Sequence, residues 1–168
     1  MKLLLNDFGG YAFIAQLARE LARKGIQVHH CYCDSLLTTP HGNINLNIKI
    51  DDYKVNPILL ERPLQKYSLM TRRRQEIEYG NRVARMVSEI KPDCVISANT
   101  PLDALNKVWK ATDKTNGKKV FWLQDIIGLA TMGVLEKKLP IVGKIIGNHY
   151  IRLEKKLLAA SDRIITIS

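Results

Sequence analysis

The chain has 168 residues, of which 46% are hydrophobic and 25% are charged. This length suits one domain with a sizeable core, and this balance excludes an intrinsically disordered chain. The apolar run at the start is too short for a signal peptide, and no uncharged apolar run reaches the ~18 residues that a membrane-spanning helix needs. We therefore expect a cytoplasmic protein that does not cross a bilayer.

The formal net charge of +10 points to anionic partners such as nucleotide phosphates, nucleic acid or an anionic membrane surface. Part of this charge belongs to a salt-bridged, solvated helix face, because Arg74, Glu78 and Arg82 follow one another at helical spacing. Single-stranded nucleic acid needs aromatic side chains on which its bases stack, and only 7% of the residues are aromatic. We therefore expect no nucleic-acid partner.

The predicted elements begin with a short apolar strand over 2–6, a turn over 7–10 and a helix that starts at Tyr11. Gly9 and Gly10 let the backbone of such a turn approach a ligand closely, and the first N–H groups of the helix can bind an anion. The turn predicts a phosphate-binding loop, with turn geometry alone as the alternative. A dinucleotide-binding G-x-G-x-x-G pattern is missing, which disfavours a nicotinamide-dependent dehydrogenase.

The first half of the chain continues as helices and strands in alternation. Apolar residues at helical spacing predict that the first helix runs to Ala22, and Gly25 ends it. The patterns that follow predict a strand over 26–33, a weaker strand over 43–50, a loop over 53–62 and a helix over about 64–91. Pro57 supports the loop, and Pro92 ends the helix.

The second half repeats this alternation. Thr100 as N-cap and Pro101 as first helical residue predict the start of a helix that runs to Thr112. The segment over 126–139 has no clear pattern. The other predicted elements are a buried strand over 93–97, a strongly apolar strand over 118–123, a helix from Pro140 onward and a strand over 163–168.

The three cysteines, Cys31, Cys33 and Cys94, all lie in apolar, strand-like segments. Their odd number and their positions favour reduced thiols in a core over a disulfide scaffold. His29 would share one strand face with the first two, which raises a metal-site hypothesis. No second cysteine pair follows at zinc-finger spacing, so we favour the core interpretation.

Strands in alternation with helices predict an α/β fold, a Rossmann-like parallel sheet with helices on both faces. Ligands of such sheets gather at the carboxyl ends of the strands. Asp34 follows the second strand and is interpreted as a turn residue. Three other loops, 7–10, 97–100 and 124–125, follow strands that should be neighbours, and we expect them to line one crevice.

Four segments carry a family resemblance: the strand that ends in Gly9-Gly10, KPDCVISANTP at 91–101, FWLQD at 121–125 and SDRIITIS at 161–168. They span essentially the whole chain. In this order and at these separations, the chain resembles the N-terminal domain of a family 4 glycosyltransferase of the GT-B type.

The resemblance implies retaining transfer of a sugar from a nucleotide-sugar to a saccharide or lipid-linked acceptor, in the synthesis of surface polysaccharide or another glycoconjugate. It implies no cofactor and no metal, because the nucleotide-sugar is a co-substrate. The glycine loop of that family faces the donor phosphates, which corresponds to Gly9 and Gly10. Asp125 stands where many members carry a histidine in the catalytic cleft, and it is the catalytic candidate. The remaining cleft candidates are Asn99, Thr100 and Gln124.

Structural roles remain open for part of this set. A cap of the following turn or helix is the alternative for Asp125, and capping alone also accounts for Thr100. The segment over 126–156 mixes apolar residues with lysines, which makes it a candidate contact with the inner face of an anionic membrane. The alternative for this segment is a packed helix with a solvated, charged rim.

The nucleotide-sugar pocket of the GT-B architecture lies in a second Rossmann-like domain, which would follow Ser168. The resemblance therefore implies that residues 1–168 form the acceptor-binding domain, that the C-terminal nucleotide-sugar domain is absent and that the chain is inactive alone. The alternative is a stand-alone, non-catalytic Rossmann-like module that binds a nucleotide or phosphate. The unprotected final strand favours the half-enzyme interpretation.

Overall fold

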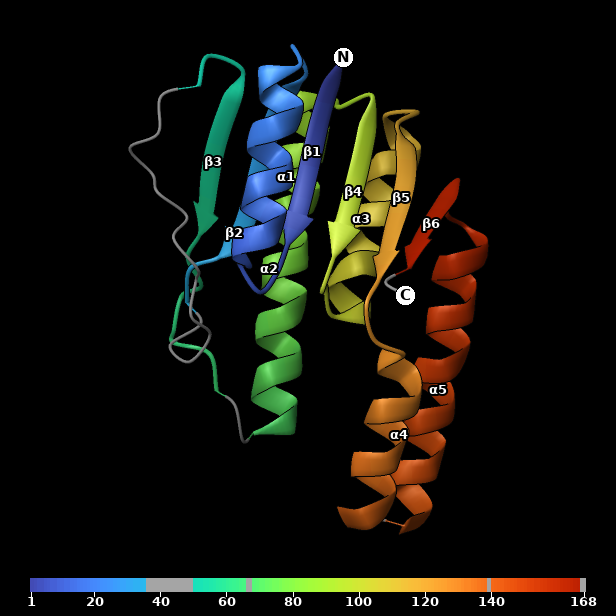
Figure 1. The fold of residues 1–168 in the computed structure, drawn as a ribbon. Coiled ribbons are helices and arrows are strands. Elements are labelled where there is room, and N and C mark those ends of the chain that lie inside the picture. Colours follow the sequence, from blue (N-terminus) through green and yellow to red (C-terminus); the bar gives the residue numbers. More distant parts are fainter. Residues whose placement is uncertain (36–49, 66–67, 139, 167–168) are drawn as a thin grey trace.

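A computed structural model describes residues 1–35, 50–65, 68–138 and 140–166 of the chain (Figure 1). Its strands form one six-stranded parallel sheet in the order β3-β2-β1-β4-β5-β6. The strands are β1 (Lys2–Asp7), β2 (Gln27–Cys33), β3 (Tyr53–Ile58), β4 (Cys94–Ala98), β5 (Lys118–Leu123) and β6 (Arg163–Thr166). The predicted Rossmann-like parallel sheet is therefore confirmed.

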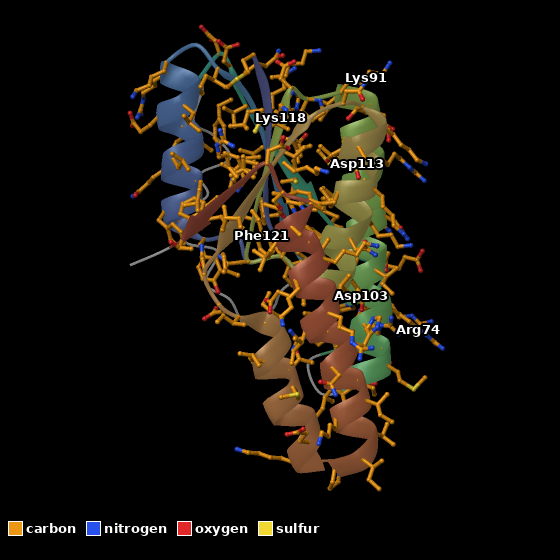
Figure 2. The ribbon with its side chains drawn as sticks, turned by 90° about the vertical axis from the view of Figure 1, so that its right-hand side faces the viewer. Arg74, Lys91, Asp103, Asp113, Lys118 and Phe121 are labelled. Carbon is orange, nitrogen blue, oxygen red and sulfur yellow. The ribbon has the colours of Figure 1, made fainter. Side chains whose placement is uncertain are left out.

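Helices cover both faces of this sheet, as Figures 1 and 2 show. Helix α1 lies on one face, and α2, α3 and α5 lie on the other. A fifth helix, α4, pairs with α5 in a hairpin that extends beyond the carboxyl edge of the sheet. The helices are α1 (Ala12–Arg23), α2 (Leu69–Ile90), α3 (Leu102–Lys114), α4 (Ile127–Lys138) and α5 (Pro140–Ala159).

The central strand β1 contributes to two separate hydrophobic cores, because successive side chains of a strand point to opposite faces. Leu3 and Leu5 pack with Ile14 under α1, whereas Leu4 packs with Tyr79 under α2. All of these side chains are at most 2% exposed. Leu4 belongs to the larger core, which α2, α3 and α5 share.

One element and one helix boundary differ from the sequence prediction. Residues 53–58 form β3, although Pro57 had suggested a loop. Proline lacks a backbone N–H, and it is tolerated here because β3 is the edge strand of the described sheet. The helix predicted from about residue 64 begins at Leu69. The strand expected over 43–50 lies outside the described residues, except for Ile50, which belongs to no strand.

The cysteines occupy the positions that the sequence suggested. Cys31 and Cys33 are fully buried in the larger core, Cys94 is half-buried, and all three are free thiols. The described part of the chain holds no group of three or more His, Cys, Asp or Glu side chains that could bind a metal ion. Within the same residues, no helix combines the length and the apolarity that a bilayer span requires.

Candidate functional site

The carboxyl ends of β1, β4 and β5 lie next to one another, because these strands are consecutive in the sheet. The register sets Asp7 opposite Ala98, and it sets Ala98 opposite Trp122. The predicted neighbourhood of these strand ends is therefore confirmed. Three loops start at this one edge: 7–10, 97–100 and 124–125.

The glycine turn after β1 is folded around the side chain of Asp7. One carboxylate oxygen accepts a hydrogen bond from the N–H of Gly9 at 3.2 Å, and the other accepts one from Tyr11 at 2.5 Å. The N–H of Gly10 donates to the backbone oxygen of Asp7 at 3.2 Å. The N–H groups that were predicted to face a donor phosphate therefore already have an internal acceptor. A phosphate can bind the N–H group of Gly9 only by displacing this carboxylate, and that of Gly10 only by displacing the backbone oxygen of Asp7.

The Asp7 carboxyl titrates well above the usual range of an aspartate. Burial raises its pKa to about 6, although the hydrogen bonds from the backbone of Tyr11 and Gly9 oppose this shift. The side chain of Asn99 lies close enough to oppose the rise in the pKa of Asp7 as well. Its Nδ2 atom nevertheless makes no hydrogen bond to a described residue. The strand edge therefore holds a buried carboxyl group whose pKa is raised well above that of a solvated aspartate.

A row of aromatic rings runs from the start of α1 to the end of β5. The ring centroid of Phe13 lies 5.7 Å from that of Tyr11 and 5.8 Å from that of Trp122. Tyr11 and Phe13 are 38% and 41% exposed. A Cβ atom on Gly9 would lie 2.2 Å from the Tyr11 ring, so a larger residue at this position would have to displace that ring from the row. Sequence reasoning missed the row, because it joins residues from distant parts of the chain.

Three buried nitrogen atoms at the same edge have no hydrogen-bond partner among the described residues. They are Nδ2 of Asn99, Nε1 of Trp122 and Nε2 of Gln124. Each unpaired buried donor costs on the order of 1–3 kcal/mol, so such a group is rarely retained without a water or a ligand to bind it. These three donors are therefore candidates to bind a water or an acceptor atom of a ligand.

Asp125 follows Gln124 directly and is exposed to solvent. None of the described residues binds its carboxylate, and it does not cap α4. That role belongs to the buried Glu154 of α5, whose oxygens accept hydrogen bonds from the N–H groups of Ile127 at 2.8 Å and Gly128 at 3.1 Å. The predicted alternative of a helix cap is therefore wrong for Asp125, and its carboxylate is exposed at the edge of the site without a partner among the described residues.

Thr100 takes a different position from the one predicted. Its side chain is 1% exposed and lies on the α2 side of the sheet. Asn6 Nδ2 donates to Oγ of Ser97 at 2.8 Å and to Oγ1 of Thr100 at 2.9 Å, while the hydroxyl of Tyr79 donates to Asn6 Oδ1 at 2.6 Å. Helix α3 instead begins after Pro101, without a side-chain cap. The N-cap prediction for Thr100 is therefore wrong, and the side chain belongs to a buried network.

Two further features lie outside this edge. Asp34 is exposed in the turn after β2, as predicted for a turn residue. A hollow of about 380 Å³ between α2 and α3 is lined by the cations of Arg85, Lys107, Lys110 and Lys114. Neither Asp34 nor this hollow contributes a side chain to the aromatic row or to the three unpaired donors.

No protein-family model and no curated protein sequence matches this chain. Solved structures do match its fold. UGT2 from Phytolacca americana, in complex with UDP-2fluoro-glucose and pterostilbene, has a TM-score of 0.63 at 11% identity over 100% of this chain and 48% of its own. UGT89C1 from Arabidopsis thaliana, in complex with UDP-L-rhamnose, has a TM-score of 0.59 at 11% identity over 99% of this chain and 44% of its own.

The structure of UGT2 without ligand gives a similar result, with a TM-score of 0.61 at 9% identity over 100% of this chain and 46% of its own. The chain thus spans about half the length of the structures that it matches. At such low identity the likeness is one of fold. It supports the predicted GT-B half, and it does not separate family 4 from other GT-B families. The chain has the Rossmann-like fold of one half of a GT-B protein.

Proposed function

We propose that this chain is the acceptor-binding half of a glycosyltransferase of the GT-B type. One observation carries the proposal: an exposed aromatic row lies beside three unpartnered N–H donors at the carboxyl edge of the sheet. A sugar ring presents apolar C–H groups, which pack on aromatic faces, and hydroxyl oxygens, which accept hydrogen bonds from N–H groups. The edge therefore has the chemistry of a saccharide site.

The donor is proposed to be a nucleotide-sugar, as in the plant structures, two of which were solved with a UDP-sugar bound. Within this proposal the donor is held chiefly by a second domain, because Asp7 already occupies the N–H groups of Gly9 and Gly10. The free carboxylate of Asp125 orients an acceptor hydroxyl in the cleft. Retaining chemistry, family 4 membership and a role in polysaccharide or glycoconjugate synthesis belong to the same proposal, and they rest on the sequence resemblance.

The stand-alone nucleotide-binding module is the competing function. It requires nucleotide phosphates at the glycine turn, where the negative charge of Asp7 opposes them. The two functions therefore differ in which ligand the chain binds by itself. The half-enzyme should bind disaccharides and bind UDP or UDP-glucose only weakly, whereas the module should do the opposite.

Titration calorimetry with cellobiose, maltose and lactose tests the proposal. Trp122→Phe keeps the aromatic ring and removes the Nε1 donor, and Gln124→Met removes the amide at similar length. Each loss of one hydrogen bond should weaken disaccharide binding roughly fivefold. The control is Gln16→Met, which removes an exposed amide from α1.

Three outcomes would contradict the proposal. The first is disaccharide affinity that both site variants leave unchanged. The second is tight UDP binding without any disaccharide binding, which would favour the stand-alone module. The third is sugar transfer by the 168-residue chain alone, because a half-site should not turn over.

A further inference from the structure

The hairpin of α4 and α5 extends past the carboxyl edge of the sheet, and its tip lies away from the strands (Figure 1). Glycines allow the two helices to pack closely. A Cβ atom on Gly143 would lie 2.3 Å from the backbone oxygen of Leu135, and one on Gly147 would lie 2.4 Å from the side chain of Met132. The seam between the helices is therefore built around small residues.

Several large apolar side chains of the hairpin are exposed, whereas Leu135 and Leu157 are buried. On α5, Ile141 is 79% exposed, Ile145 is 67% exposed and Val142 is 51% exposed. On α4, Leu129 and Val134 are 51% and 52% exposed. In water, burial of an isoleucine stabilises a protein far more than burial of a glycine. Exposed isoleucines beside buried glycines are therefore unfavourable for a hairpin that is surrounded by water. Small residues in the seam are usual where helices pack in apolar surroundings.

Positive charge accompanies these apolar residues. The outer face that begins with Ile141 and Ile145 continues two turns later with Arg152 and Lys156, because residues seven and four apart share a helix face. Among the hairpin side chains that the structure describes, the other exposed cations are Lys137, Lys144 and Lys155. No ion pair forms to any of these five cations within the described ranges.

Negative charge is kept away from this surface. The hairpin contains two carboxylates, Glu136 and Glu154. Glu154 is 4% exposed and binds the N-terminus of α4, and Glu136 is half-buried. The surface therefore combines exposed isoleucines with uncompensated lysine and arginine side chains.

We propose that the tip of this hairpin docks on a lipid bilayer that contains anionic lipids. Ile141, Val142 and Ile145 enter the outer apolar layer, and the ammonium groups of Lys137 and Lys144 reach the lipid phosphates along their apolar stems. Arg152 and Lys156 lie on the part of α5 that stays above the bilayer and attract its negative surface. The positive charges beside the isoleucines favour an anionic bilayer as the partner. An uncharged apolar partner would account for the isoleucines and not for the cations.

The proposal is independent of the proposed function, although the two surfaces share one edge of the molecule. An apolar hollow of about 340 Å³ lies at the base of the hairpin, lined in part by Leu123 and Ile126, which flank Gln124 and Asp125 in the chain. Docking by the tip would hold the candidate site close to the bilayer surface.

Co-sedimentation with vesicles tests the proposal. Phosphatidylcholine vesicles with phosphatidylglycerol are compared with vesicles of phosphatidylcholine alone. The chain should bind the first and not the second, and added salt should weaken the binding. The double variant Ile141→Ser/Ile145→Ser should lose roughly tenfold or more in affinity, because both side chains would lose their apolar contact. The double variant Lys144→Glu/Lys156→Glu should abolish the preference for phosphatidylglycerol.

The matched control is Lys107→Glu/Lys110→Glu, which changes the same charge on α3, beside the hollow between α2 and α3 and away from the hairpin. This control should bind the anionic vesicles nearly as well as the unaltered chain. Equal loss in both charge variants would overturn the proposal, because net charge alone would then drive binding. Binding that ignores phosphatidylglycerol, or that survives the isoleucine changes, would also overturn it. So would a dimer in sedimentation velocity that only the isoleucine variant disrupts, since a second copy would then cover the tip.

Discussion

Two groups of polar side chains lie at the same sheet edge, and they differ in how completely they are hydrogen bonded. On the α2 side, Asn6 satisfies its amide within a closed network of buried partners. At the ends of β4 and β5, Asn99, Trp122 and Gln124 leave buried donors unpaired among the described residues. A satisfied network stabilises the fold, whereas unpaired donors lower stability and are available to a ligand. The comparison separates structural residues from candidate site residues of the same chemical type.

The largest expected effect comes from breaking the satisfied group. Asn6→Leu removes the acceptor of the buried Tyr79 hydroxyl and the amide donor to Ser97 and Thr100, which among the described residues keep only the hydrogen bonds between themselves and to the Ala98 oxygen. We expect a loss of about 3–4 kcal/mol in the free energy of unfolding, measured by urea denaturation followed by circular dichroism. A loss below about 1 kcal/mol would show that the network contributes little.

Asp7 gives the second effect, which depends on pH. Its pKa is about 6 in the folded chain against 3.8 for an unperturbed aspartate, so the folded state binds a proton more tightly than the unfolded state. Stability should therefore fall as pH rises from about 4 to 6, by about 3 kcal/mol from this group. Asp7→Asn should remove this part of the pH dependence. Parallel pH profiles of the free energy of unfolding for the two proteins would contradict the assignment.

Asp103 shows the opposite pH dependence and a smaller effect. It accepts hydrogen bonds from Arg73 at 2.8 Å and from the hydroxyl of Tyr150 at 2.7 Å, and it lies between the helices that carry them (Figure 2). Burial alone would raise the pKa of Asp103, but these partners outweigh it and hold the pKa below the usual value. Its contribution is present above pH 3.8 and is lost as pH falls through the folded pKa.

Asp103→Asn should therefore cost about 1 kcal/mol at neutral pH and less in acid, because Arg73 is half-exposed and the pair is partly screened. Urea denaturation at neutral and acid pH measures the difference. Lys118 pairs with Asp162 on the surface, and Asp162→Asn is the control for a solvent-screened ion pair. If Asp103→Asn lowers the free energy of unfolding no more than Asp162→Asn, the hydrogen bonds of Asp103 do not stabilise the packing of α2, α3 and α5.

The sequence predicted β1, β2, β4, β5 and β6 because each of them has its own local signal, such as the apolar run before Gly9, and it predicted the end of α1 from Gly25. It did not predict α4, because glycines form part of the seam of the hairpin and leave α4 without an apolar stripe on one side. The loop predicted around Pro57 was wrong because the sequence does not show the order of the strands. Only that order shows that β3 is an edge strand, where a proline is tolerated.

The sequence predicted which strand ends lie together at the candidate site. It predicted less of which side chains there bind one another or remain unpaired. The strand ends could be placed from the alternation of elements. The internal acceptor of the glycine turn had a local signal, because an aspartate two residues before Gly9 can accept its N–H in an Asx-turn. The aromatic row and the unpaired donors had none, because Phe13 and Trp122 meet only through the order β1-β4-β5.

The smallest expected effect on stability concerns the unpaired group, and it is the sharpest test of the comparison. Gln124→Met removes a buried Nε2 atom that has no described partner, so no hydrogen bond is lost with it. The free energy of unfolding should change by less than about 0.5 kcal/mol, or rise, because an unsatisfied amide no longer has to be buried. Urea denaturation of Gln124→Met beside Asn6→Leu measures both groups in one experiment. A loss of about 2 kcal/mol or more in Gln124→Met would mean that Gln124 is bound within the protein. The distinction between structural and ligand-facing residues would then fail at this edge.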